Sequence, residues 1–450
     1  MMSFAPRAFL AAASLIAGLS WAAPGEAATR IERVVSPGGI VAWLVSDASV
    51  PLVAMNVAFR GGANQDPADK PGVGYLAVGL LDEGAGELDA KAFQSRLERN
   101  AVELGFSMQR DEVRGSLRVL RDRKDEGFEL FRLAVTSPRF DDDAVERVRA
   151  QALSGLRRES TNPNDIGTRL WWSSAFPNHP YGRPINGTLE SVPQISRDDL
   201  RDYARRVLAR DNLVISVVGD IDAQTLAPLL DRVFGALPAK SELRALPAVK
   251  MEGAGKRLFS PLDVPQSVVT FGGTGLARKD PDFIAAYVVN HILGGSAFSS
   301  RLYKEVREKR GLAYSVYSYL LPLDATALLM GGTQTRGDKA DEAVGLIEAE
   351  IAKLAAEGPG AEELDQAKSY IMGSYALNFD TSAKIANLLV QIQLDDLGID
   401  YIERRNALVA AVTMEDVRRV AKRLLDGGIL VSVVGREPEK ANPAAGKPGG

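Results

Sequence analysis

Residues Ser216–Asp220 read Ser-Val-Val-Gly-Asp, and Ser432–Arg436 repeat the pattern as Ser-Val-Val-Gly-Arg 216 residues later. Each copy follows a stretch in which a hydroxyl residue, Ser196 or Thr413, stands three residues before an acidic residue. This spacing is typical of a helix start, because the hydroxyl caps the first turn while the carboxylate reaches back to the cap. Further matches recur at nearly the same offset, so the chain is predicted to contain two homologous domains.

A polar stretch punctuated by Pro and Gly separates the two repeats. The 450 residues are also too many for one ordinary hydrophobic core. The N-terminus has an Arg, a short apolar run and then small residues, the pattern of a cleaved signal peptide. The alternative is an N-terminal membrane anchor, which the shortness of the apolar run disfavours. The predicted segments are a signal peptide at 1–27, a first domain at 28–238, a linker at 239–257, a second domain at 258–437 and a disordered tail at 438–450.

Strand-like and helix-like patterns of apolar residues alternate along the chain, most clearly in the first half. The expected strands are 31–46, 50–60 and a hairpin of 106–110 with 113–120. The expected helices are 75–81, 91–104, 142–159 and 197–209. Runs of strands with separate helices predict an α+β fold, in which each domain is a mainly antiparallel β-sheet with helices packed on one face.

Composition and motifs argue against several classes of function. The formal net charge of −4 is unlike that of nucleic-acid-binding proteins or polybasic membrane-binding proteins. Beyond the signal peptide no apolar stretch is long enough to span a membrane. The chain has no Cys, which removes thiol nucleophiles and thiolate metal sites. No phosphate-loop, dinucleotide or Gly-x-Ser-x-Gly motif is present. The signal peptide predicts a periplasmic protein.

Residues Gly72–Gly84 form a Gly-rich entry, an apolar helix and a Gly exit. This frame resembles the one in which the inverted zincin peptidases (pitrilysin, insulysin, mitochondrial processing peptidase) carry His-x-x-Glu-His. In this sequence Tyr75 and Gly79 stand at the His positions, Val78 at the Glu position, and Gly155 at the position of the third zinc ligand. None of these side chains can bind zinc or activate water as the motif requires. The resemblance therefore implies a chain that binds no metal or cofactor of its own.

Residues 293–317 resemble another segment of the same family, in which Leu-Gly-Gly and Ser-Arg-Leu precede an Arg and a Tyr seven residues apart. Carried over, these are Arg307 and Tyr314, which the resemblance places across the cavity from the zinc. A guanidinium and a phenol at that place would stabilise the negative charge that amide hydrolysis builds on the carbonyl oxygen. The alternative is that both are ordinary helix-surface and strand residues. Arg301, in an equally motif-like context, is assigned a structural role.

The two His of the chain are expected to be structural. His179 lies in a His-Pro-Tyr-Gly-Arg-Pro loop similar to one of the same family, and His291 lies on an apolar helix of the second half. A zinc site with two His within this chain would need them to meet across the domains.

The resemblance implies the non-catalytic subunit of a heterodimeric periplasmic zinc metallopeptidase. A homologous partner with intact His-x-x-Glu-His would carry the zinc and the general base, and this chain would supply Arg307 and Tyr314 in trans to a peptide substrate. A peptide would add as a strand to an exposed sheet edge. The alternative is a peptide-binding or scaffold protein with no role in hydrolysis, and retention of the Arg/Tyr segment favours the first interpretation.

Overall fold

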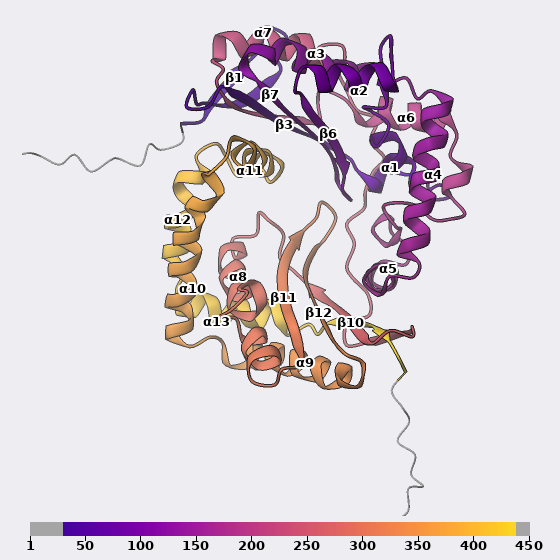
Figure 1. Ribbon diagram of the computed structural model, residues 1–450. Helices are drawn as coiled ribbons and strands as arrows, with labels where there is room; N and C mark the ends of the chain where they lie inside the picture. Colours follow the sequence, from indigo (N-terminus) through magenta and orange to yellow (C-terminus); the bar gives the residue numbers. More distant parts are fainter. Residues whose placement is uncertain (1–29, 438–450) are drawn as a thin grey trace, which may run out of the picture. The chain divides into compact units, whose positions relative to one another are not determined.

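The repeated Ser-Val-Val-Gly pattern forms a strand in both halves, β8 (Leu213–Gly219) and β13 (Leu430–Gly435). The computed structural model describes residues 30–437, and within these the chain from Ile31 on forms one compact unit (Figure 1). The predicted signal peptide at 1–27 and the predicted tail at 438–450 lie outside the described residues. Among residues 30–437, every helix is too short or too polar to span a bilayer.

Each half contains one sheet. The first sheet has the strand order β1-β2-β8-β3-β7-β6, and the second has the order β11-β12-β10-β13-β9. Only β2 with β8 and β13 with β9 pair in parallel, so both sheets are mainly antiparallel as predicted. The remaining strands are β1 (Glu32–Val35), β2 (Val41–Ser46), β3 (Leu52–Arg60), β6 (Glu103–Met108), β7 (Glu112–Leu120), β9 (Arg257–Pro261), β10 (Gln266–Thr274), β11 (Ala313–Pro322) and β12 (Ala327–Arg336), with a small pair of β4 (Gly84–Ala85) and β5 (Leu88–Asp89).

The helices complete the α+β fold that the sequence predicts. In the first half they are α1 (Val73–Val78), α2 (Ala90–Arg99), α3 (Lys124–Thr136), α4 (Asp142–Glu159), α5 (Pro163–Ala175), α6 (Arg197–Val207) and α7 (Ala223–Phe234). In the second half they are α8 (Phe283–Asn290), α9 (Ala340–Glu357), α10 (Ala361–Gly373), α11 (Ser382–Leu394), α12 (Tyr401–Ala411) and α13 (Met414–Leu425). As predicted, Ser196 caps α6 and Thr413 caps α13, each in a reciprocal capping box with the Asp three residues later.

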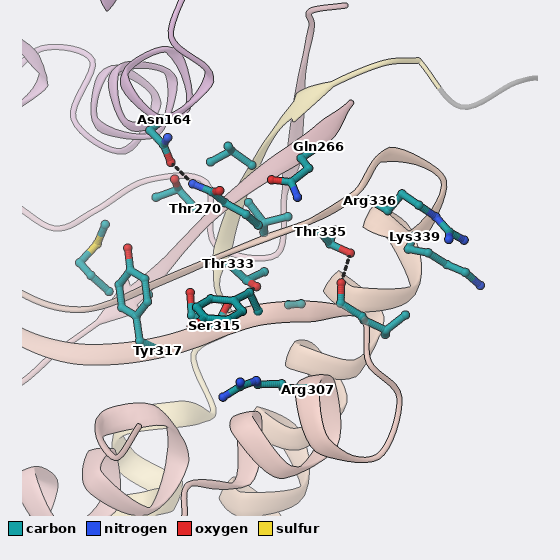
Figure 2. Close-up of a pocket in the computed structure, with 18 of the residues that line it drawn as sticks. Asn164, Gln266, Thr270, Arg307, Ser315, Tyr317, Thr333, Thr335, Arg336 and Lys339 are labelled. Carbon is teal, nitrogen blue, oxygen red and sulfur yellow. Dashed lines mark hydrogen bonds between the residues drawn. The ribbon is translucent and has the colours of Figure 1, made fainter. Parts of the chain in front are cut away.

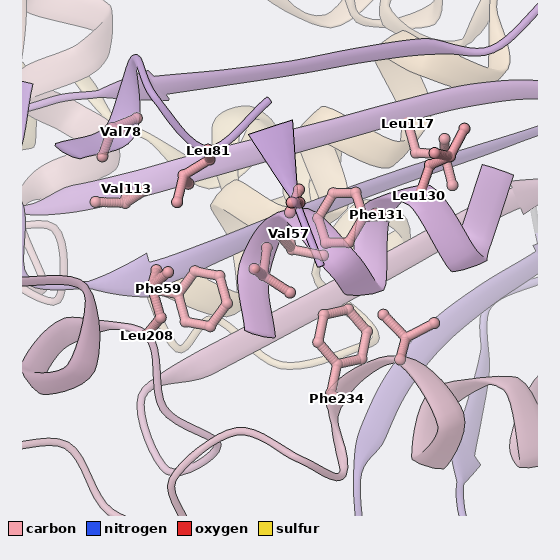
Figure 3. Close-up of a cluster of buried hydrophobic side chains, with 14 of the residues drawn as sticks. Val57, Phe59, Val78, Leu81, Val113, Leu117, Leu130, Phe131, Leu208 and Phe234 are labelled. Carbon is pink, nitrogen blue, oxygen red and sulfur yellow. The ribbon is translucent and has the colours of Figure 1, made fainter. Parts of the chain in front are cut away.

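The core of the first half lies between the first sheet and its own helices. Figure 3 shows aromatic rings from α3 and α7 among aliphatic side chains of the strands. Phe131 and Phe234 meet edge to face with ring centroids 5.9 Å apart, and both are fully buried. Such burial of large apolar side chains is the main stabilising term of the fold.

The second face of each sheet contacts one helix from the other half. On the first sheet Val218 of β8 packs with Ala386 and Leu389 of α11. On the second sheet the indole N–H of Trp171, on α5, donates a hydrogen bond to the carbonyl of Leu430 at 2.9 Å. Strands β8 and β13 are apolar on both faces, which requires cover on both sides.

The serines of the repeat occupy equivalent places, because each contacts the helix that the other half packs on its sheet. Ser216 accepts a hydrogen bond from Gln393 of α11 at 2.8 Å, and the Ser432 hydroxyl donates to the carbonyl of Gly167 on α5 at 2.9 Å. The two halves are therefore joined by α5 and α11 as well as by the segment 239–256, which contains neither helix nor strand in the described structure.

Several predicted elements have different bounds in the structure. The helix expected at 75–81 is α1 (Val73–Val78), the helix expected at 197–209 ends at Val207, and the strand expected at 106–110 is β6 (Glu103–Met108). The strand expected at 31–46 is two strands, because the chain turns between Ser36 and Ile40 with Gly39 at φ +84°. The helix expected at 91–104 ends at Arg99, because Ala101 adopts φ +50° and the following residues enter β6.

Candidate functional site

A cavity of about 880 Å³ lies over the face of the second sheet that α5 contacts (Figure 2). Side chains of β10, β11 and β12 form its floor, and Asn164, Thr168 and Trp172 of α5 line it from the first half. The amide of Gln334 on β12 donates to the Asn164 side chain at 3.0 Å and ties this wall to the floor. The cavity is therefore built by both halves of the chain, and its volume lies in the range of small-ligand sites, about 300–1,000 Å³.

The structure brings Arg307 and Tyr314 together at this cavity. Arg307 lies in the π-helical turn Tyr303–Glu308, and Gly311, at φ +61°, turns the chain into β11, where Tyr314 is the second residue. The Arg307 guanidinium carbon lies 5.0 Å from the centroid of the Tyr314 ring, and both residues line the cavity. Tyr314 is 85% exposed. The arrangement places a positive charge and a phenol hydroxyl on the same cavity wall.

Tyr303 is a site residue that the sequence reasoning missed. Its hydroxyl accepts a hydrogen bond from Arg307, and the guanidinium carbon lies 4.9 Å from the centroid of its ring. The Arg307 side chain is thus held by two aromatic rings, those of Tyr303 and Tyr314. The available signal was the spacing of four residues between Tyr303 and Arg307, which makes side chains neighbours on a helical turn.

The exposed position of Tyr314 follows from an irregularity in β11. The pairing of β11 with β12 shifts register between Ala313 and Val316, so Tyr314 lies within a bulge. Bulges change the direction of a side chain and are frequent beside functional sites. β11 is also an edge strand of its sheet, which leaves backbone groups on one side without a strand partner in the described structure.

The residues at the predicted zinc positions do not fit a zinc ion. Tyr75 is partly exposed on α1, Val78 is buried in the core, and Gly79 follows the helix on its surface. Gly155 lies on α4, which contacts α1. The four positions offer one phenol and no imidazole or carboxylate, whereas such a site takes His and acidic ligands. Within residues 30–437 no cluster of three or more His, Cys, Asp or Glu could hold a metal.

His179 and Arg301 make structural contacts outside the cavity lining. The His179 ring accepts from the backbone N–H of Tyr181 at 3.2 Å and lies 3.0 Å from the carbonyl of Pro247, which ties the 239–256 segment to the first half. Burial lowers the pKa of His179. Arg301 forms an ion pair with Glu363 at 2.7 Å, at the start of α10.

His291 is buried and stacks on Tyr370 with ring centroids 5.1 Å apart. Burial lowers the pKa of His291 as well. Neither His lines the cavity that holds Arg307.

A second cavity of about 590 Å³ shares Thr168, Trp172 and Tyr319 with the first, and its lining includes both Arg and acidic residues. Burial lowers the pKa of Arg110, which lies 3.6 Å from the Trp172 ring centroid, to about 10. Burial, together with the nearby Asp111, raises the pKa of Asp324 to about 6. The second cavity thus places partly desolvated charges beside the first.

Comparison with known proteins relates most of the chain to one peptidase family. Residues 41–189 match the model of the insulinase (peptidase family M16) domain, and residues 194–371 match that of the peptidase M16 inactive domain. A non-peptidase homolog of Helicobacter pylori is 28% identical over 342 residues, which cover 75% of this chain and 78% of that protein. An uncharacterized zinc protease of Streptomyces coelicolor is 26% identical over 420 residues, which cover 91% of this chain and 90% of that protein.

Solved structures agree with this relationship. A crystal structure described as the peptidase M16 inactive domain of Pseudomonas fluorescens has a TM-score of 0.85 and 27% identity, covering 91% of this chain and 98% of the other. A protease from Helicobacter pylori has a similar fold, with a TM-score of 0.81 and 20% identity, covering 90% of this chain and 99% of the other.

Proposed function

This chain belongs to the M16 (insulinase) peptidase family, and we propose that it is the non-catalytic subunit of a heterodimeric periplasmic zinc metallopeptidase. A homologous partner carries His-x-x-Glu-His, the zinc and the general base. This chain supplies Arg307 and Tyr314 in trans. The proposal is supported by a contrast within one chain: the zinc positions have lost every ligand, whereas Arg307 and Tyr314 remain side by side on a cavity.

Arg307 and Tyr314 are proposed to act by electrostatic stabilisation of the reacting peptide carbonyl. When a nucleophile adds to a peptide carbonyl, negative charge develops on the oxygen, and donors fixed in advance at that oxygen lower the barrier. Arg307 offers several N–H donors in a planar fork, and contact with Tyr303 and Tyr314 limits the positions that the fork adopts. Tyr314 offers a hydroxyl that is free to reach a ligand, since its side chain is largely exposed.

The peptide is proposed to bind as an added strand along β11. An extended peptide pairs with an open sheet edge through its backbone groups, and alternate side chains enter pockets on the sheet face. Edge strand β11 carries Tyr314 and also provides part of the cavity floor. Backbone pairing would therefore hold the peptide next to Arg307 and Tyr314.

The test is reconstitution with a homologous zinc-bearing subunit from the native host. The chain alone should hold no stoichiometric zinc and cleave no peptide, and the mixture should cleave. Tyr314→Phe should lower the turnover of the mixture by ~10²–10³, the loss typical for one oxyanion donor. Tyr370→Phe is the matched control, because Tyr370 is exposed but lies outside the cavity lining.

Two results would count against this assignment. Metal-dependent cleavage by the pure chain would contradict a non-catalytic subunit, and unchanged turnover in Tyr314→Phe would remove that hydroxyl from the reaction. A mixture that binds peptide without cleaving it would favour the peptide-binding or scaffold alternative. Cell fractionation of the native host tests the periplasmic location.

A further inference from the structure

We propose that the cavity beside Arg307 selects peptides by a carboxylate, either an acidic side chain or a free C-terminus, with an apolar side chain a few residues away. This inference rests on the proposed function in one respect, the binding of peptides at Arg307 and Tyr314. It adds the class of peptide, which neither the family relationship nor the Arg/Tyr pair specifies.

The charge of the cavity lining is the first observation. Four cations line it, namely Arg307, Arg310, Arg336 and Lys339, and its lining in the described structure contains no Asp or Glu. Arg307 and Arg310 precede β11, whereas Arg336 and Lys339 stand at and just beyond the end of β12. The antiparallel register pairs Ala313 with Thr335 and so brings the two segments to the same end of the cavity.

The partners of these cations show which of them can bind a ligand. Arg310 is paired with Glu305 at 2.6 Å, Arg336 with Asp338 at 2.5 Å and Lys339 with Glu342 at 2.8 Å. These cations are exposed or partly exposed, and ion pairs open to solvent are weak, so a ligand carboxylate can compete for them. Arg307 has no carboxylate within ion-pair distance among residues 30–437, and its charge is held against two aromatic rings.

Arg307 binds the reacting carbonyl in the proposed function, so the ligand carboxylate pairs with the neighbouring Arg310, Arg336 and Lys339. A guanidinium such as that of Arg336 matches both oxygens of a carboxylate in a planar, bidentate arrangement. The Arg307 charge, held against Tyr303 and Tyr314 at the same end of the cavity, adds a favourable field for the approach of a negative group.

The other end of the cavity is aromatic. Trp172, Tyr317, Tyr319 and Met330 line it, and the rings of Tyr317 and Tyr319 stack with centroids 6.2 Å apart. Along β11, Tyr314 and Tyr319 are five residues apart, or about 17 Å in an extended strand. A peptide of roughly this length, with a carboxylate at one end and an apolar side chain at the other, complements both ends.

The experiment measures binding to the full chain alone, without a partner subunit. Fluorescent hexapeptides share one apolar residue and differ in the charged group: Glu, Gln or Lys at a fixed position, each with a free or amidated C-terminus. Anisotropy should show that peptides with a Glu side chain or a free C-terminus bind at least tenfold more tightly at low salt than the amidated Gln and Lys peptides, which have no carboxylate. This advantage should shrink at high salt, because exposed charges are screened.

Variants then locate the site. The double variant Arg336→Gln/Lys339→Gln should weaken the acidic peptides several-fold and leave the neutral peptides unchanged. Lys422→Gln is the matched control, because Lys422 lies on α13 outside this cavity. If amidation removes the preference, the ligand group is the C-terminal carboxylate, and if Glu→Gln in the peptide removes it, the group is a side chain; either result supports the proposal.

Equal affinity for acidic, neutral and basic peptides would overturn the inference, as would an acidic preference that the double variant leaves intact. Circular dichroism of each variant excludes unfolding as the cause of a loss. If the chain prefers carboxylates but no partner mixture cleaves peptides, the proposed role in hydrolysis fails and the carboxylate selection stands. If a partner mixture cleaves all three peptide classes equally well and binding shows no preference, the carboxylate selection alone fails.

Discussion

At the scale of single residues, the side chains at the predicted zinc positions determine whether this chain can bind a metal. At the predicted zinc positions stand Tyr75, Val78 and Gly79, in the frame of the His-x-x-Glu-His motif, and Gly155, at the expected third ligand, and none of the four offers a zinc ligand or a general base. A Cβ on Gly155 would lie 3.9 Å from the Arg158 guanidinium, an ordinary contact, whereas a Cβ on Gly79 would lie 3.3 Å from the Tyr75 carbonyl oxygen and needs a small adjustment. The missing zinc ligands are therefore explained by the side chains present and not by a lack of space for larger ones.

Returning three ligands should restore metal binding without activity. The variant Tyr75→His/Gly79→His/Gly155→Glu places one imidazole on α1, a second four residues later at the end of that helix, and a carboxylate on the neighbouring α4, and three protein ligands suffice for zinc. Val78 stays as it is, because it is buried in the core and no base is needed to bind metal. We expect the variant to retain stoichiometric zinc after dialysis, measured by mass spectrometry, and to cleave no peptide.

The single variant Tyr75→His is the control, since one added imidazole should not hold the metal. If the triple variant retains no more zinc than the parent chain, the end of α1 and the middle of α4 do not converge in the way a zinc site needs.

At the site, sequence reasoning could identify residues joined by a short stretch of chain. Arg307 and Tyr314 are seven residues apart and lie together in the structure, because Gly311 turns the chain between them. The cavity wall formed by Asn164 and Trp172 could not be predicted in this way. These residues come from the other half, and no local pattern records which helix covers a distant sheet.

At the scale of elements, the sequence predicted type better than extent. The predicted helix 142–159 coincides with α4, and the caps at Ser196 and Thr413 are confirmed. The helix expected at 91–104 was too long, because apolar spacing continues past Arg99 although Ala101 leaves the helical region of φ. The contacts of α5 and α11 with the opposite sheets went unpredicted for the same reason as the cavity wall.

The close approach of α5 to the second sheet can be tested at Gly167. A Cβ on this residue would lie 3.3 Å from Val434 Cγ2 and 3.5 Å from the Thr270 hydroxyl. Gly167→Val should therefore overpack this contact and lower the free energy of unfolding by about 1–3 kcal/mol, measured by urea denaturation.

The matched control is Gly345→Ala on α9, where a Cβ would meet nothing within 4 Å. Replacing a glycine inside a helix by alanine should raise stability by about 0.5–1 kcal/mol. A Gly167→Val chain as stable as the parent would mean that α5 does not rest on the sheet as closely as described.

At the scale of the whole molecule, charges in the second cavity connect the halves. Arg60 of β3 donates to the carbonyl of Leu394 at 2.6 Å and lies 3.9 Å from Asp324, which follows β11. Asp111 accepts from the backbone N–H of Asp324 at 2.9 Å and from the Tyr181 hydroxyl at 2.8 Å. Partial desolvation in the second cavity and the nearby Asp111 disfavour the charged form of Asp324, although half of its side chain is exposed, so its pKa rises to about 6.

This pKa predicts a pH effect of definite sign. Between pH 3.8, the ordinary value, and about 6, the folded chain holds the Asp324 proton more tightly than the unfolded chain does. The contribution of this carboxyl to stability therefore falls as pH rises through that window. Asp324→Asn removes the titration, so the Tm of the variant relative to the parent should be higher at pH 7 than at pH 4.5, measured by thermal unfolding.

Asp426→Asn, at an exposed position outside this cavity, should show the same relative Tm at both pH values. A parent-to-variant difference at Asp324 that is independent of pH would show that its carboxyl does not change charge in this range.

The exchange of α5 and α11 has a consequence for how the chain can evolve. In each half, one face of the sheet is covered by a helix of the other half. Gly167 contacts Ser432, and Gln393 contacts Ser216, through hydrogen bonds between the halves. Neither copy is a self-sufficient module that recombination can move elsewhere. A change at one of these contacts must be compensated in the other half, so covariation should join positions 177 and 265 residues apart in the sequence.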